Sequence, residues 1–299
     1  MLKKEFFVLF AVLAVLSLSF AGYAVAQPGQ EKASEPAKAN LTNWKSLLSK
    51  EIAAANFDSA VYVLNVANND KFEHNVNKRF SSASIIKLFI LNELFAQDKR
   101  GEVRLGNAIT FDHAKAVDGG MLHKFSSGAT LRMEDLALFM LAVSDNTATN
   151  LLIDYLGMDK INTSIKALGT RETILGRKML DSAARLAGRD NFTCAADVGI
   201  VLNSFLKNDP RILDMLSLQK NNYKLSAKLG FDDFDDLEPI FAHKTGELGG
   251  IEHDAGIFFY ATPQPVIVVV LTAGLPDVDT GRNFIANIGR IVYQTFNRE

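Results

Sequence analysis

Two residues that could form a nucleophile and its base, Ser84 and Lys87, lie three positions apart in the stretch RFSSASIIKLFILNELF. On a helix, residues at i and i+3 share a face, so the hydroxyl and the amine would come within reach of each other. The surrounding residues are almost all apolar, which indicates a helix that is buried on most sides. Burial lowers the pKa of a lysine, and a neutral amine beside a hydroxyl can act as a general base for a nucleophile.

This spacing does not establish the chemistry by itself. The chain repeats it at Ser217 and Lys220, near the end of an expected surface helix where no further motif accompanies it. Ser84 also lies at the expected start of a helix, where serine is favoured as an N-cap. From these residues alone, Ser84 is either a nucleophile or a helix-start serine.

Two further stretches place polar residues where they could line a cleft. MLAVSDNTATNLL carries S-D-N at 144–146 between two expected helices, and FAHKTGELGG carries K-T-G at 244–246 on an expected strand. S-x-x-K, S-D-N and K-T-G, in this order, are the motif set of class A β-lactamases and penicillin-binding proteins. From about residue 42 to 297 the chain resembles a class A β-lactamase or a closely related penicillin-recognising serine hydrolase.

The resemblance implies catalytic roles for four residues. Ser84 would attack the carbonyl carbon of an amide and become acylated, and Lys87 would help to remove its proton. Ser144 would pass a proton to the departing nitrogen, aided by the positive charge of Lys244.

The resemblance also implies the substrate contacts. Asn146 would hold the amide of the substrate's side chain, and Thr245 would donate a hydrogen bond to the substrate's carboxylate. Gly246 would allow the substrate to approach the strand backbone closely. The backbone N–H groups of Ser84 and Glu247 would form the oxyanion hole.

One expected residue is absent from the region after the second motif. In class A β-lactamases a glutamate in an E-x-x-L-N segment activates the water that removes the acyl group. Aligning LGTRETILGRKMLDSAARLAGRDN from its first residue puts Met179 at the glutamate position and Ala183 at the asparagine position. The segment resembles instead the R-K-M-x-D form of a subgroup of class A-like hydrolases and penicillin-binding relatives. Asp181 is a possible substitute base, and a surface ion pair with a neighbouring cation is its alternative role.

An arginine that would bind the substrate's carboxylate is hard to place. His253 falls near one of the usual positions, and Arg282 falls near another. A shift of one residue in GGIEHDAG would undo the first assignment, and a lone histidine of this kind is more often an ordinary strand residue. The sequence leaves the carboxylate partner open.

Three functions are compatible with these motifs. The leading one is a class A β-lactamase-like hydrolase that forms an acyl-serine, with a role in β-lactam catabolism and antibiotic resistance. The alternatives are a D-alanyl-D-alanine peptidase acting on peptidoglycan stem peptides and a β-lactam binder or sensor that stays acylated. Loss of a general base costs about 10² to 10⁴ in rate, so acylation could survive while turnover collapses. A sensor would need a signalling or membrane-spanning part, and the sequence has no second apolar segment of spanning length.

Composition narrows the class of protein further. The 299 residues are 48% hydrophobic and 22% charged, which is typical of a globular chain with a sizeable core. The formal net charge of −2 gives no electrostatic reason to expect nucleic-acid binding. A single cysteine, Cys194, permits no intrachain disulfide, and the five histidines show no metal-ligand spacing, so no zinc mechanism and no cofactor is expected. The expected partner is a small β-lactam or a stem peptide, and the expected state is a monomer.

The N-terminal residues differ from the rest of the chain. Lys3 and Lys4 precede an apolar stretch at 6–20, and a small-x-small site follows at 24–26. This pattern predicts a signal peptide over 1–26 that is cleaved after Ala26, with export to the periplasm or the medium. An uncleaved anchor is the alternative, but the apolar stretch is shorter than the ~20 residues of a spanning helix. Residues 27–40 are expected to be a flexible linker and residues 41–299 to be the hydrolase domain, with no stable membrane insertion after cleavage.

The remaining patterns predict the elements that position the motifs. Helices are expected at 44–55, 83–96, 132–142, 147–156, 159–166, 194–206, 211–219 and 281–296. Strands are expected at 59–68, 71–76, 242–248, 253–261 and 265–273. Strands at both ends with helices between them indicate an α+β fold, with one antiparallel sheet built from both termini and a helical lobe that leaves a cleft at the boundary.

Overall fold

The computed structural model describes residues 43–231 and 240–297. The expected signal peptide at 1–26 and the expected linker at 27–40 lie outside the described residues. No helix in the described ranges combines the length and the apolar character that a membrane span requires.

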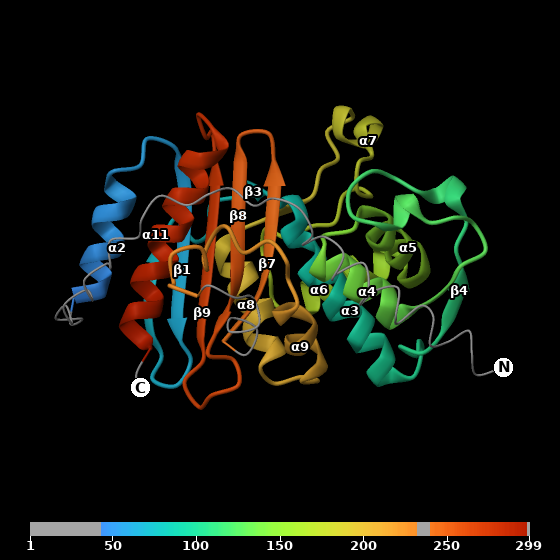
Figure 1. Ribbon diagram of the computed structural model, residues 1–299, viewed down its shortest axis with the longest axis horizontal. Helices are drawn as coiled ribbons and strands as arrows, with labels where there is room; N and C mark the ends of the chain where they lie inside the picture. The colour runs from blue at the N-terminus through green and yellow to red at the C-terminus, as the bar shows by residue number, and fades with distance from the viewer. Residues whose placement is uncertain (1–42, 232–239, 298–299) are drawn as a thin grey trace, which may run out of the picture. The chain divides into compact units, whose positions relative to one another are not determined.

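A five-stranded antiparallel sheet joins the two ends of the described chain, as expected (Figure 1). Its order is β2-β1-β9-β8-β7. The N-terminal strands are β1 (Asp58–Asn65) and β2 (Asp70–His74), and the C-terminal ones are β7 (Phe241–Leu248), β8 (Ile251–Phe258) and β9 (Val266–Ala273). β1 pairs with β9 along its whole length, and β7 forms a sheet edge with the K-T-G motif on it.

Helices cover both faces of this sheet. α2 (Trp44–Ala53) and α11 (Val278–Phe296) pack together on one face, where β1 and β9 contribute alternate valines to a core with Phe284 and Ile288. α8 (Ala195–Phe205) lies on the other face, because its Gly199 is in contact with the Tyr62 ring of β1. Residues alternate between faces along a strand, so the two layers of side chains belong to separate halves of the core.

The middle of the chain forms the expected helical lobe. Its helices are α3 (Lys87–Arg100), α4 (Met133–Ala142), α5 (Asn146–Leu156), α6 (Met158–Ala167), α7 (Ser182–Leu186) and α9 (Arg211–Ser217). α3 is buried on nearly all sides, as its sequence predicts, and it contacts α4, α5, α6 and α8. α9 lies against β7, so the K-T-G strand lies at the junction of sheet and lobe.

The start of the helix that carries Ser84 differs from the expectation. Ala83–Ile86 form a 3₁₀ turn, η3, and the α-helix begins only at Lys87. Ala83 has a φ of 45°, a left-handed conformation that a residue with a Cβ adopts at a cost. A 3₁₀ turn has three residues per turn, so Ser84 and Lys87 still share a face.

Several short elements were not predicted. β3 (Phe80–Ser81) pairs with β6 (Phe192–Thr193), and β4 (Ala108–Thr110) pairs with β5 (Thr130–Arg132). Two further 3₁₀ turns, η4 (His113–Lys115) and η5 (Leu122–Lys124), lie in the segment between β4 and β5. Strands of two or three residues are too short to show an alternating pattern, so periodicity cannot identify them.

Candidate active site

The amine of Lys87 is buried, and its side chain is 0% exposed. Its Nζ donates to the Ser144 carbonyl oxygen at 2.6 Å, to Ser144 Oγ at 3.0 Å and to Asn146 Oδ1 at 3.0 Å. Burial lowers the pKa of Lys87 well below its usual value, and the charge of Lys244 lowers it further, whereas Asp145 acts in the opposite direction. The structure therefore brings the first two motifs together through one amine. Among the described residues no hydrogen bond joins this amine to Ser84, whose residue is partly exposed.

These three contacts depend on the protonation state of Lys87. An ammonium has three N–H groups, which matches the three acceptors, whereas a neutral amine has two N–H groups and one lone pair. The Ser144 carbonyl oxygen and Asn146 Oδ1 can only accept, and Asn146 is oriented by its Nδ2, which donates to the Asp118 carbonyl oxygen at 2.9 Å. When Lys87 loses a proton, the Ser144 hydroxyl is the partner that can turn and donate to it.

Ser144 Oγ lies between two lysines. Lys87 Nζ is 3.0 Å away on one side, and Lys244 Nζ donates to the same oxygen at 3.1 Å on the other. Ser144 is held in the left-handed region with a φ of 55°, between the end of α4 and the start of α5. Such strain in a non-glycine residue persists only where the surroundings enforce it.

Asp145 provides much of that constraint. It is the N-cap of α5, and its Oδ1 accepts from Ala148 N at 2.8 Å. Its Oδ2 accepts from Met121 N at 2.6 Å and from Leu122 N at 2.8 Å. A Cβ on Gly120, which has a φ of 87°, would lie 2.3 Å from Asp145 Oδ2, so only glycine fits there. One buried carboxylate thus fixes α5 and the loop before η5 around Ser144.

Lys244 is as deeply buried as Lys87. It lies on β7, and its Nζ also donates to the Thr245 carbonyl oxygen at 3.0 Å. Its pKa is lowered to about 7, chiefly by burial and also by the charge of Lys224, whereas Asp254 and Glu247 act to raise it. The site therefore holds two buried amines with lowered pKa values and one hydroxyl between them.

Replacing Lys244 by methionine is expected to stabilise the fold, most strongly at low pH. Between a folded pKa of about 7 and the usual 10.5, native Lys244 binds fewer protons than unfolded Lys244, so the stability of the natural protein rises with pH across this window. Below this window the whole shift acts against folding and costs about 5 kcal/mol. The lost hydrogen bonds offset about 2 kcal/mol of the gain, which leaves about 3 kcal/mol at pH 6.

Urea unfolding of both proteins at pH 6 and pH 10 checks this result. Exposed Lys50 on α2 is the control, because Lys50→Met should change stability little at either pH. An advantage for Lys244→Met that stayed the same at pH 10 would contradict the sign of the pKa shift.

Gly246 of β7 lies against η3, the turn that carries Ser84. A Cβ on Gly246 would lie 3.2 Å from Ala83 Cβ and 3.3 Å from Ser84 N. The strand and η3 are also in extensive contact. The structure therefore places S-x-x-K, S-D-N and K-T-G at one point, where the backbone N–H of Ser84 adjoins the strand that carries Glu247.

Thr245 and Glu247 contact residues 221–224, for which the sequence predicted no role. Asn221 Nδ2 lies 3.4 Å from Thr245 Oγ1, and the Tyr223 hydroxyl donates to Glu247 Oε1. Lys224 is fully buried, and its Nζ donates to the carbonyl oxygens of Gly246 and His253, each at 3.1 Å. Residues 221–224 belong to no motif. Their local sequence gives no indication that Lys224 is buried against a strand that is distant in the sequence.

The segment around Met179 is fixed to the same helix as Asn146. Asn150 follows Asn146 by one turn of α5, and its side chain is hydrogen-bonded to the Met179 backbone twice. Asn150 Oδ1 accepts from Met179 N at 2.8 Å, and Asn150 Nδ2 donates to the Met179 carbonyl oxygen at 3.1 Å. Met179 itself is buried. The position that would carry a glutamate is therefore anchored one helical turn from the Lys87 partner.

Asp181 and its cationic neighbours have other local partners. Asp181 is exposed and is the N-cap of α7, where its Oδ1 accepts from Ala184 N at 2.9 Å. Arg177 pairs with Asp190 at 2.7 Å, and Lys178 pairs with Asp154. The observed contacts thus give Asp181 a capping role.

The two candidate carboxylate partners differ in their surroundings. His253 is fully buried, with Nε2 2.9 Å from the Ser81 carbonyl oxygen and Nδ1 accepting from Thr272 N at 3.1 Å. Burial lowers its pKa to about 4, so it is neutral at physiological pH. Arg282 is partly exposed, and its guanidinium lies 4.1 Å from the centre of the Tyr223 ring.

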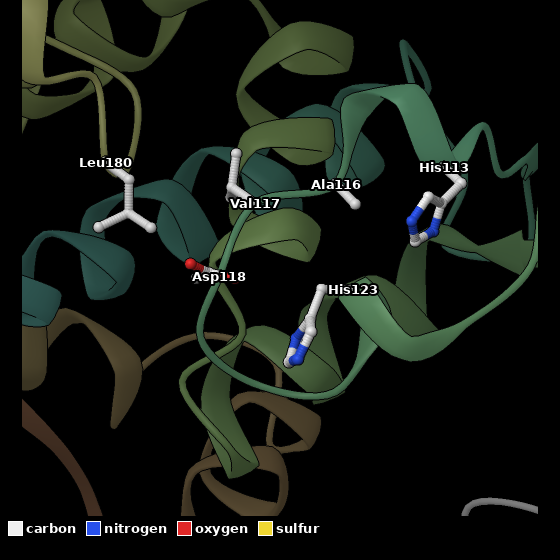
Figure 2. A pocket seen from close by; sticks show the side chains of 6 residues that line it. All are labelled: His113, Ala116, Val117, Asp118, His123 and Leu180. Carbon is white, nitrogen blue, oxygen red and sulfur yellow. The ribbon is translucent and has the colours of Figure 1, made fainter.

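An open pocket of about 410 Å³ adjoins Asn146, and it does not include Ser84. Figure 2 shows its lining, with His113 and His123 on one side and Asp118 and Leu180 on the other. The Asp118 carbonyl oxygen accepts from Asn146, which connects the pocket to the site. Among the described residues no three His, Cys, Asp or Glu side chains gather as a metal site.

Comparisons with known proteins agree with this geometry. The model described as "Beta-lactamase enzyme family" matches residues 43–296. The β-lactamase PSE-4 of Pseudomonas aeruginosa is 25% identical over 148 residues, which make up 49% of this chain and 51% of that protein, so the match spans about half the length of that relative. The crystal structure of a β-lactamase from Sphaerobacter thermophilus is 29% identical, with a TM-score of 0.75 over 84% of this chain and 96% of that one. A mutant of PBP-A, solved as an acyl-enzyme complex with penicillin G, is 25% identical, with a TM-score of 0.73 over 86% and 97% of the two chains.

Proposed function

The chain belongs to the β-lactamase enzyme family, and on this premise we propose that it is a serine hydrolase that opens β-lactam amides through an acyl-Ser84 intermediate. The observation that carries the proposal is the Ser144 hydroxyl, which lies between the amines of Lys87 and Lys244 beside the nucleophile segment. Two buried lysines with lowered pKa values are costly to a fold and typical of a catalytic site.

Acylation would proceed by transfer of one proton around the site. Ser84 Oγ attacks the carbonyl carbon, and its proton passes to the neutral amine of Lys87. The C–N bond of the lactam breaks as Ser144 donates its proton to the nitrogen, and Lys87 returns a proton to Ser144. Lys244, when charged, stabilises the negative charge, and the backbone N–H groups of Ser84 and Glu247 would bind the developing oxyanion.

We further propose that deacylation is slow. Met179 cannot activate water, and it stands where the sequence alignment expects the glutamate that would do so. Asp181 remains the alternative base, although it would have to leave the Ala184 N–H to act. A D-alanyl-D-alanine peptidase is the second candidate function. Such an enzyme does not have to hydrolyse penicillin, so it does not need the glutamate that Met179 replaces.

The compartment and the biological role are part of the same proposal. Residues 1–26 support export, with cleavage after Ala26. An exported enzyme would meet both β-lactams and peptidoglycan peptides. A role in antibiotic resistance requires turnover, so it depends on the deacylation rate.

Intact-mass measurement of the 27–299 protein with benzylpenicillin tests this function. We expect one adduct that maps to Ser84 and persists for hours, and no adduct on Ser84→Ala. Ser217→Ala is the matched control at the second S-x-x-K spacing and should acylate normally. A short-lived adduct with rapid release of hydrolysed penicillin would contradict slow deacylation, and Asp181→Asn would then be the next variant. No adduct with any β-lactam would reject the assignment of Ser84.

A further inference from the structure

Five charged or hydroxyl side chains gather at the end of β7 beside the active site. Lys224 Nζ lies 3.2 Å from Glu247 Oε1 and 2.6 Å from Glu252 Oε2. The Tyr223 hydroxyl donates to Glu247, and Arg282 stacks on the Tyr223 ring with its Nε 3.8 Å from Glu252 Oε1. We call these residues, Tyr223, Lys224, Glu247, Glu252 and Arg282, the Glu247 cluster.

The geometry of β7 places this cluster next to Thr245. Residues i and i+2 of a strand lie on the same face, so the side chains of Thr245 and Glu247 are neighbours. The segment that faces them repeats this arrangement, with Asn221 at Thr245 and Tyr223 at Glu247. Thr245 is only 1% exposed. With the side chains placed as they are, its hydroxyl is not open to a substrate.

Two cations of the cluster, Lys224 and Arg282, could bind an anionic group of a substrate, but carboxylates of the chain itself already lie beside them. Lys224 and Arg282 are balanced by Glu247 and Glu252. Burial acts to raise the pKa of Glu247, but Lys224 and the Tyr223 hydroxyl outweigh it, so this carboxyl has a pKa below its usual value. Glu252 is buried, whereas the Glu247 side chain is 40% exposed. Glu247 is therefore the carboxylate that can swing into solvent.

We propose that Glu247 occupies the anion site of the free enzyme, and that a substrate's carboxylate must displace it from Tyr223 and Lys224 before acylation. The inference rests on the proposed function and adds a specificity determinant to it. The Arg282 side chain is 34% exposed, and its buried Nε has no hydrogen-bond acceptor among the described residues, so Glu252 does not fully engage this cation. Substrates with no negative charge at this position meet no such competition.

The test compares benzylpenicillin with its methyl ester on the natural protein and on Glu247→Gln, with second-order acylation rates measured by intact mass. We expect Glu247→Gln to acylate faster than the natural protein with the acid and to raise the ratio of the acid rate to the ester rate about tenfold. Tyr223→Phe, which removes one hydrogen bond that holds Glu247, should show the same selectivity with a smaller gain.

Glu73→Gln is the matched control. Glu73 is 41% exposed and pairs with Lys71 at 3.1 Å, but it lies on β2 at the opposite edge of the sheet. Removing that charge should leave both rates unchanged. A slower or unchanged rate with the acid would overturn the inference, and so would an equal gain with both compounds, because that would indicate a changed oxyanion hole. If neither compound acylates the natural protein or any variant, the proposed function fails and the inference fails with it.

Discussion

Replacing Lys87 by methionine is expected to slow acylation of Ser84 by about 10³-fold, because the reaction would lose the proposed general base. Methionine keeps the length of the apolar stem, but it can neither accept the serine proton nor return one to Ser144. The variant should fold, since burying the charged form of Lys87 opposes folding and the thioether needs no partner. The measurement is the rate of adduct formation at several pH values.

The pH dependence separates a base from a structural residue. The lowered pKa of Lys87 means that the neutral amine forms at lower pH than for an ordinary lysine, so the acylation rate of the natural protein should rise as Lys87 deprotonates. In Lys87→Met this rise should disappear. Lys220→Met is the matched control, because Lys220 also follows a serine by three residues but is exposed. A Lys87→Met variant that kept the natural rate and pH profile would remove Lys87 from the mechanism.

The contacts of Lys87 show how much of the site the sequence could predict. The apolar run around Lys87 predicted a buried amine, and the three motifs were expected to line one cleft. In the structure Lys87 is hydrogen-bonded to Ser144 and Asn146, a contact that no motif predicts by itself. The sequence did not predict the 3₁₀ turn over Ala83–Ile86 or the left-handed Ser144. Both conformations occur at tertiary contacts, because Gly246 of β7 lies against Ser84, and Asp145, next to Ser144, accepts from the backbone of Met121 and Leu122. Local propensity cannot report constraints of this kind.

The fold was predictable for a different reason. Strands of eight residues and helices of ten or more carry a clear hydrophobic period, and the sheet, its antiparallel order and the long helices agree with that period. The Glu247 cluster has no period and no motif. Lys224 reaches the carbonyl oxygens of β7 and β8 across a large sequence separation, and only the folded chain shows that its charge is matched by Glu247 and Glu252.

The proposed slow deacylation predicts the second large effect, which is a gain of function in a variant at position 179. Met179→Glu would place a carboxyl group at the position that Asn150 fixes through two hydrogen bonds to the backbone. Because these bonds involve only the backbone, they should survive the substitution. We expect the penicillin adduct to become short-lived and turnover to increase by about 10² to 10⁴, the range that one general base contributes.

Met179→Gln tests whether a glutamate at this position acts by accepting a proton or only by its size and polarity. Glutamine has almost the size and polarity of glutamate, but it cannot accept a proton from water, so its adduct should persist as in the natural protein. In Met179→Glu, burial should raise the pKa of the new carboxyl, so turnover should rise with pH as the carboxyl ionises. Equal turnover by the glutamate and glutamine variants would show that loop packing, and not a missing base, limits release. Rapid turnover by the natural protein would instead show that another group, with Asp181 as the first candidate, already activates the water.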